Sequence, residues 1–195
     1  ELLLTAPVRQ RAAQLAREQP ELAEIAERLA EGIPVEGMES LAPLLGAGEL
    51  VAVWPEGFKG IGKRYKDRYK LQRFGRGGFV ATALRAQVPI VPTAIVGSEE
   101  IYPMVYDLKL LARLLGFPYF PVVAQMFALP VFGPFAMLPL PSKWIIEYGA
   151  PIDTSDYGPE AADDPMVVFD LADQVRERIQ EMLHRNLLGR RSIWL

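Results

Sequence analysis

The sequence predicts an α/β fold in which a mixed, largely parallel sheet is flanked by helices. Short apolar runs that are typical of buried strands alternate along the chain with amphipathic helical patterns. Half of the 195 residues are apolar, which is enough for a sizeable core. We expect a helical segment over residues 1–31 and an α/β domain over residues 32–195.

The expected elements follow one another with short connections. Residues 7–31 have a helical pattern with a break near Pro20, which opens the second helix because proline is tolerated at a helix start. A short extended piece at 32–35 leads to a helix over 38–45. The expected strands are 50–54, 90–96 and 143–148, and the later helices are 78–87, 104–115 and 166–188. Pro89 and Pro92 restrict the second strand to an edge or irregular position.

The composition excludes several kinds of chemistry. The chain has no cysteine, so disulfides, thiolate metal sites and a cysteine nucleophile are excluded. Its formal net charge of −3 makes any basic stretch a local feature and not a global signature of nucleic-acid binding. The run 2–4 is too short for the apolar region of a signal peptide, and we expect a cytoplasmic location.

Residues 49–78 are the stretch that carries the most chemistry. An apolar run ends at the turn Pro55-Glu56-Gly57, and a glycine-rich basic segment, residues 58–78, follows. Backbone N–H groups and fixed cations together can bind a phosphate, although a solvated basic loop has the same composition. Glu56 favours the ligand site, because open α/β sheets bind ligands beyond the carboxyl ends of their strands. The segment has one acid, Asp67, and eight cations: Lys59, Lys63, Arg64, Lys66, Arg68, Lys70, Arg73 and Arg76.

Three blocks of this sequence occur at a characteristic spacing. Residues 53–57 read V-W-P-E-G, residues 71–79 read L-Q-R-F-G-R-G-G-F, and residues 88–97 begin V-P-I-V-P. They resemble the F-P-E-G and V-P-[IV]-[VI]-P blocks of the glycerolipid acyltransferases, the PlsC-like family of lysophosphatidic acid acyltransferases. The resemblance covers roughly residues 32–152 and implies a glycerol-phosphate-acyltransferase-like fold.

The resemblance implies transfer of a fatty acyl group from acyl-CoA or acyl-carrier protein to the hydroxyl of a lysophospholipid or glycerol phosphate. No cofactor or metal is implied. Glu56 and Gly57 would hold the phosphate of the acceptor, and their charge adds Lys59 and Arg73 to this substrate-binding site. Because an anionic Glu56 cannot bind phosphate directly, we expect it to orient loop N–H groups or a basic side chain. We also expect a peripheral position on the inner face of the membrane.

The catalytic motif of that family, H-x4-D, is absent from this sequence. In the family the histidine is the general base and the aspartate orients it. Five positions after His184, the one histidine, stands Gly189, so no catalytic residue is assigned. The family's acceptor-site motif begins at Gly32, but its arginine position holds Gly37. We expect a block that carries the histidine to be missing before Ile33. The alternative is a catalytically inactive, acyltransferase-like protein that binds lipid or phosphate.

Residues 114–142 carry no charge at all, over a length that could span a membrane. Six prolines in this stretch argue against a spanning helix, because each removes a backbone donor. Two interpretations remain: a meandering buried loop, or an apolar surface that rests on lipid or lines an acyl site.

Nucleotide and nucleic-acid binding are disfavoured by the motifs around the turn. Residues 57–62 do not give G-x-G-x-x-G, and Arg64 stands where a P-loop needs serine or threonine. Tyr65, Tyr69 and Phe74 could stack on bases. The flanking apolar strands suit a lipid enzyme better, and we expect no nucleic-acid partner.

Overall fold

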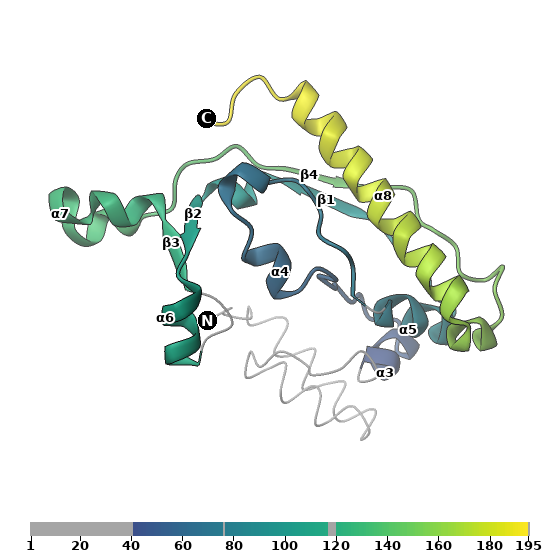
Figure 1. The fold of residues 1–195 in the computed structure, drawn as a ribbon. Helices are drawn as coiled ribbons and strands as arrows, with labels where there is room; N and C mark the ends of the chain where they lie inside the picture. The colour runs from purple at the N-terminus through teal and green to yellow at the C-terminus, as the bar shows by residue number, and fades with distance from the viewer. Residues whose placement is uncertain (1–40, 76, 117–119, 195) are drawn as a thin grey trace. The chain divides into compact units, whose positions relative to one another are not determined.

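The computed structural model describes residues 41–75, 77–116 and 120–194. The expected N-terminal helices, the domain boundary after residue 31 and the block expected before Ile33 all lie outside these residues. The chain divides into two units, each of which combines distant stretches of sequence (Figure 1). The first unit holds residues 41–53, Gly77–Pro89 and Asp153–Val168, and the second holds Trp54–Arg76, Ile90–Ile152 and Phe169–Leu195.

The first unit is built around one short helix, α5, which packs against α3 and the 3₁₀ helix η7. Its elements are α3 (Ala42–Gly46), α5 (Gly78–Ala86), η7 (Pro159–Asp163) and the start of α8 (Pro165–Gly189). Val80 and Leu84 of α5 are completely buried. Left-handed residues flank the helix, Gly77 with φ 73° and Gln87 with φ 52°. Glycine is required at position 77, because a Cβ there would lie 2.5 Å from the side chain of Val168.

The second unit contains two small antiparallel sheets. Strand β1 (Thr93–Val96) pairs with β4 (Ile145–Tyr148), and β2 (Met104–Asp107) pairs with β3 (Pro121–Val123). In the first sheet only alternate residues of β1 are fully buried, as expected for a strand with one face against a core.

The core of the second unit lies between the β1–β4 sheet and helix α8. Ala94 and Val96 of β1 are completely buried and form one apolar cluster with Met182 and Leu183 of α8. Tyr69, from the basic segment, completes this cluster. The basic segment is therefore anchored in the core by an aromatic side chain.

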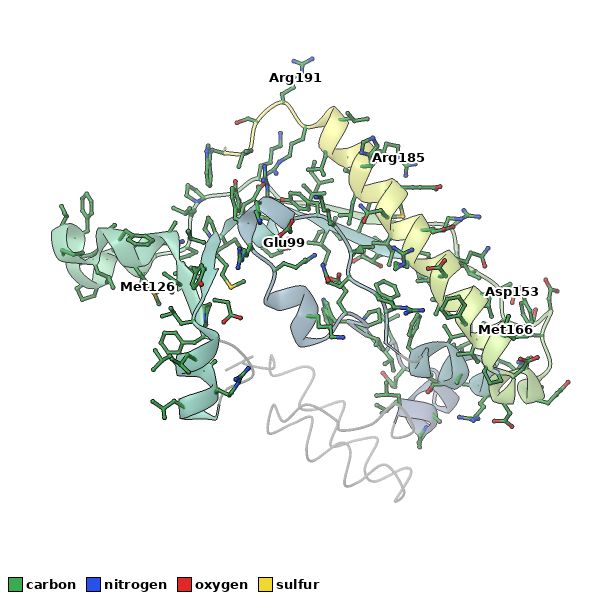
Figure 2. All side chains as sticks on the ribbon, viewed as in Figure 1. Glu99, Met126, Asp153, Met166, Arg185 and Arg191 are labelled. Atoms are coloured by element: carbon green, nitrogen blue, oxygen red, sulfur yellow. The ribbon has the colours of Figure 1, made fainter. Side chains whose placement is uncertain are left out.

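Short helices form the rest of the second unit. They are α4 (Phe58–Ile61), η3 (Tyr65–Asp67), η4 (Ser98–Glu100), α6 (Lys109–Leu115), η5 (Ala124–Ala128), α7 (Leu129–Phe132) and η6 (Gly133–Met137). The last three follow one another directly, and Met126 marks this stretch in Figure 2. Among the described residues, no helix combines the length and the hydropathy that a membrane-spanning segment needs.

Three predicted elements are confirmed, with shorter bounds in two cases. The helices predicted at 78–87 and 166–188 are α5 and α8, and the strand predicted at 143–148 is β4. The strand predicted at 90–96 begins only at Thr93, because Pro92 cannot donate to the ladder. Ile90 instead makes an isolated bridge to Ile152.

Three other predictions were wrong. Both described sheets are antiparallel, whereas a largely parallel sheet was expected. The run 50–54 forms no strand, because no described strand pairs with its backbone. Its side chains Leu50 and Trp54 are 98% and 73% exposed. The helix predicted at 104–115 begins as strand β2, since Val105 and Tyr106 favour an extended backbone. Only its leucine-rich end is helical, as α6.

Candidate functional site

The Pro-Glu-Gly turn holds a second stretch of the same unit beside it. The carbonyl of Pro55 accepts a hydrogen bond from the N–H of Gly75 at 3.4 Å, and a carboxylate oxygen of Glu56 accepts one from the N–H of Gln72. Gly57 has a φ of 55°, a left-handed conformation that favours glycine. The turn therefore brings together two sequence blocks that lie about 16 residues apart.

Helix α4 packs closely against Glu56 and leaves no room for a larger residue. A Cβ at Gly60 would lie 2.5 Å from Oε2 of Glu56 and 2.7 Å from its Cβ. Glycine at position 60 is thus required by this contact and not by a left-handed backbone. The orientation of the Glu56 carboxylate depends on this glycine.

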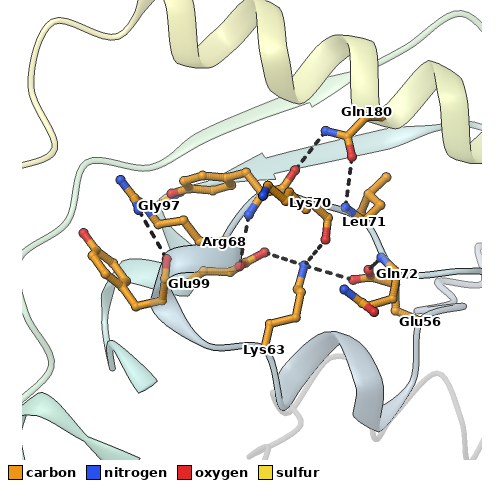
Figure 3. A network of polar contacts seen from close by, with 11 residues as sticks. Glu56, Lys63, Arg68, Lys70, Leu71, Gln72, Gly97, Glu99 and Gln180 are labelled. Carbon is orange, nitrogen blue, oxygen red and sulfur yellow. Dashed lines mark hydrogen bonds and ion pairs between the residues drawn. The ribbon is translucent and has the colours of Figure 1, made fainter. Parts of the chain in front are cut away.

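Lys63 is a buried cation of the basic segment, and Figure 3 shows its polar contacts. Its side chain is 4% exposed, and its Nζ lies 3.0 Å from Oε1 of Glu99 and 3.6 Å from Oε2 of Glu56. It also donates a hydrogen bond to the carbonyl of Lys70 at 3.1 Å. Burial of this ammonium is tolerated because two carboxylates and a carbonyl surround it. Glu56 therefore orients a loop N–H group and a basic side chain, as expected from its charge.

Tyr69 makes three hydrogen bonds that hold its backbone and its hydroxyl. Its backbone is left-handed, with a φ of 63°. Its N–H donates to Oε2 of Glu99 at 3.2 Å, and its carbonyl accepts from Nε2 of Gln180 at 2.9 Å. Its hydroxyl accepts a hydrogen bond from the N–H of Gly97 at 2.9 Å. Burial raises the pKa of Tyr69 to about 12, and the neighbouring carboxylate of Glu100 adds to the rise.

Glu100 and Arg190 form an ion pair that is almost completely buried. Their side chains are 1% and 3% exposed, and Nη1 of Arg190 lies 2.6 Å from Oε2 of Glu100. Arg68 approaches the other oxygen of Glu100 at 3.8 Å, and its guanidinium lies 4.3 Å above the ring of Tyr65. Two adjacent acids of η4, Glu99 and Glu100, therefore hold two cations of the basic segment.

The four predicted substrate-binding residues separate into two kinds. Glu56 and Gly57 shape the turn, whereas Lys59 and Arg73 are exposed. The guanidinium of Arg73 lies 5.6 Å above the ring of Phe169. In the described part of the chain, no hydrogen bond or ion pair joins Lys59 to the other three. Arg73 is thus held near the turn by the bond between its neighbour Gln72 and Glu56. Lys59 lies on α4 and, within the described ranges, has no such connection to the other predicted residues.

Several residues that build the site were not singled out from the sequence. Lys63 was one cation among eight, and nothing in its local pattern distinguishes it. Glu99 and Gln180 had no predicted role, and Gln180 lies 111 residues from Tyr69, the residue that it holds. A single sequence carries no local signal for a contact at that separation. The charge pattern alone therefore did not distinguish the cations that are held in ion pairs from the cations that are exposed.

His184 is exposed on α8 and does not take part in this network. The adjacent Arg185 pairs with Glu147 of β4, and Arg185 and Asn186 together hold the pKa of Glu147 below its usual range. In the residues that the structure describes, no group of three or more His, Asp and Glu side chains is placed to hold a metal ion.

These features define a mixed α/β protein in which a Pro-Glu-Gly turn is tied to a basic segment. Residues 21–96 match the family model described as Acyltransferase. That stretch contains the turn, the basic segment and the Val-Pro-Ile-Val-Pro block. The match confirms the resemblance to the PlsC-like glycerolipid acyltransferases over this stretch of the chain.

Longer mycobacterial proteins are similar to this chain. The uncharacterized protein Rv0502 of Mycobacterium tuberculosis is 62% identical over 151 residues, and the uncharacterized protein ML2427 of Mycobacterium leprae is 63% identical over 151 residues. Each alignment covers 77% of this chain, but only 41% and 40% of the two relatives. The chain thus spans about two fifths of the length of the curated relatives it matches. No solved structure matches the chain.

Proposed function

We propose that this protein is an acyltransferase domain that moves a fatty acyl group from acyl-CoA or acyl-carrier protein to the hydroxyl of a lysophospholipid or glycerol phosphate. The observation that carries the proposal is the family match over residues 21–96, which includes a Pro-Glu-Gly turn whose glutamate is held in one orientation. In the reaction, the acceptor hydroxyl attacks the thioester carbonyl. An oxygen ester forms and the donor leaves as a thiol.

The proposed role of the residues in this chain is to bind the acceptor. Glu56 ties the backbone at Gln72 and the ammonium of Lys63, and so fixes the loop around them. Arg73 and Lys59 stay exposed, and their cations are available to a phosphate group. We assign the general base to no residue of this chain, because His184 lacks the aspartate of the family motif.

We further propose that the protein works peripherally, on the inner face of the membrane. A lysophospholipid acceptor resides in a bilayer, whereas acyl-CoA and acyl-carrier protein are water-soluble donors. An enzyme that joins the two has to meet both at the membrane surface.

A second candidate function is binding without catalysis. The observation that favours it is the absence of H-x4-D from the sequence, together with the exposed position of His184, which Gly189 and not an aspartate follows five residues later. In that case the Pro-Glu-Gly turn and the exposed cations would hold a phosphorylated lipid without transferring a group to it.

Binding is tested by comparing lysophosphatidic acid with monoacylglycerol, which has the same chain and no phosphate. Replacement of both Lys59 and Arg73 by alanine should weaken binding of lysophosphatidic acid about tenfold and leave monoacylglycerol unchanged, because two charge-assisted contacts are lost. Lys66→Ala is the matched control, since Lys66 is an exposed cation of the same segment. Equal weakening of both ligands would contradict the assignment.

Turnover separates the two candidate functions. Thiol release from acyl-CoA can be followed with a thiol reagent without background, because the chain has no cysteine. Thiol release that depends on the acceptor establishes the enzyme. Acceptor binding by this chain without turnover, alongside turnover by the longer Rv0502, would assign binding to this stretch and catalysis to the rest of the longer protein. Neither binding nor turnover would overturn the proposal.

A further inference from the structure

The residues after β3 form an apolar surface that no described part of the chain covers. We name residues 124–140, which comprise η5, α7, η6 and the three residues that follow, the apolar arm. Val131 and Phe135 are each 77% exposed and Phe127 is 69% exposed. Side chains project from both sides of this stretch in Figure 2. The other large apolar side chains exposed on the arm are Leu129, Phe132, Met137 and Leu138.

The arm is held outward by specific bonds at its base. Nε2 of Gln125, a buried side chain, donates to the carbonyl of Ile101 at 2.6 Å, and the N–H of Leu140 donates to the same carbonyl at 3.2 Å. The N–H of Ala124 donates to the carbonyl of Pro103 at 2.9 Å. Both ends of the arm are thus fixed to one short stretch before β2, so the exposed side chains belong to an ordered feature.

The chemistry of the arm suits hydrocarbon better than a protein partner. From residue 126 to residue 141 there is no polar side chain at all. Protein interfaces carry about one hydrogen bond per 100–200 Å² and a polar rim, and this surface offers no side chain for either. Four prolines, which lack an N–H, reduce the backbone donors that a lipid environment would leave unpaired.

The charges that flank the arm in the sequence favour an anionic surface. Between Asp107 and Glu147 the sequence contains three cations, Lys109, Arg113 and Lys143, and no acid. Near the arm's base, the hydroxyl of Tyr102 donates to the carbonyl of Met137, and aromatic residues with a polar end are typical of membrane interfaces. Basic residues near an anionic leaflet each add to the attraction.

We propose that the apolar arm is a bilayer-docking surface that inserts shallowly into the headgroup region of a leaflet containing anionic lipid. This inference deepens the peripheral location proposed above and rests on it, but it does not depend on acyl transfer. Shallow insertion fits the arm, because its short helices leave backbone carbonyls that need the water of the interface. The bilayer, and not a second copy of the chain, is the occupant.

The test is co-sedimentation with vesicles of phosphatidylcholine alone or mixed with phosphatidylglycerol. Binding is expected on the mixed vesicles and weaker binding on the neutral ones. The double variant Phe132→Ser, Phe135→Ser should weaken binding at least about tenfold, because two large apolar side chains no longer enter the leaflet. Leu188→Ser is the matched control, since Leu188 is 76% exposed on α8 and lies outside the arm.

Insertion itself can be located by a single fluorophore, because the chain has no cysteine. An environment-sensitive dye on Phe135→Cys should shift to the blue on vesicles, whereas the same dye on Leu188→Cys should not. Vesicle binding without the shift at position 135 would overturn the proposal, as would no vesicle binding. A solution dimer that the double serine variant dissociates would assign the arm to a second copy instead. Binding of water-soluble glycerol phosphate by the double variant tests the proposed function separately.

Discussion

In the second unit, the basic segment and the apolar arm each contain side chains whose exposure is the opposite of what their composition predicts. The basic segment contains eight of the chain's 21 lysine and arginine residues, yet the side chain of Lys63 is only 4% exposed. The arm contains no charged residue, yet Phe135 is 77% exposed. Composition describes what a side chain prefers, whereas exposure depends on the partners that the fold supplies.

The carboxylates of η4 and of the turn explain the first half of this difference. Glu56, Glu99 and Glu100 bring an acid to two cations of the segment, so the charges are compensated where they are buried. The phenylalanines of the arm, by contrast, stay exposed, because no described residue covers them. An uncovered apolar surface of an ordered element marks an interaction site, and the two regions therefore divide into a structural network and an external surface.

Among the polar contacts of the basic segment, the largest effect is expected from Lys63→Met, which removes the cation at the centre of the network. It removes the cation between Glu56 and Glu99 while it keeps most of the apolar stem. We expect a loss of about 3 kcal/mol in the free energy of unfolding, because partly buried carboxylates lose their partner. Urea denaturation measures it, and Lys66→Met, an exposed cation of the same segment, should change stability by no more than about 0.5 kcal/mol.

A double-mutant cycle sharpens this prediction. If Lys63 and Glu56 interact, the pair Lys63→Met, Glu56→Gln should cost less than the sum of its single variants. Strict additivity would show that the distance of 3.6 Å between Nζ and Oε2 carries no coupling, and that Glu99 alone holds the lysine. A loss no larger than that of Lys66→Met would contradict the description of Lys63 as a buried cation.

A smaller effect is expected from Tyr69→Phe. The variant keeps the ring in the core and removes the acceptor of the Gly97 N–H, at a cost of about 1 kcal/mol. In the wild type, the pKa of Tyr69 is raised from 10.0 to about 12. The raised pKa contributes stability that is fully present below pH 10 and is lost as pH rises through 12.

Phenolate absorbance during an alkaline titration measures this group directly. The chain has seven tyrosines, and one of them should titrate with a pKa near 12 in the folded protein. Tyr69→Phe should remove that late step and leave the others. If the late step persists in the variant, another tyrosine is the buried one.

The sequence singled out the Pro-Glu-Gly turn, whose role in substrate binding stays a prediction, whereas the predicted direction of the sheet was wrong. The Pro-Glu-Gly turn and the block around Arg73 were singled out from residue types, and their pairing follows from the hydrogen bond between Glu56 and Gln72. The sheet direction was wrong because apolar runs indicate strands but not the neighbour with which each strand pairs. The run at 50–54 shows the same limit, since apolar residues alone do not supply a pairing partner.

The network around Tyr69 could not have been predicted from one sequence. Gln180 reaches the basic segment from a helix more than 100 residues later, and its own helical pattern only marks it as polar. Arg190 and Glu100 are a similar case, since charged residues are expected at the surface and these two are buried as a pair. Contacts between distant elements come from packing, which local patterns do not contain.

The smallest effect on stability is expected at the arm. Replacing one phenylalanine in each region by alanine tests the comparison between the two regions. Phe74, in the basic segment, is 5% exposed, whereas Phe135, in the arm, is 77% exposed. Phe74→Ala should cost about 3–5 kcal/mol, because it leaves a cavity in the core. Phe135→Ala should change the free energy of unfolding by no more than about 0.5 kcal/mol, because water already surrounds the ring. A large loss from Phe135→Ala in urea denaturation would show that the arm packs against the protein, and the apolar surface would then be core and not a docking surface.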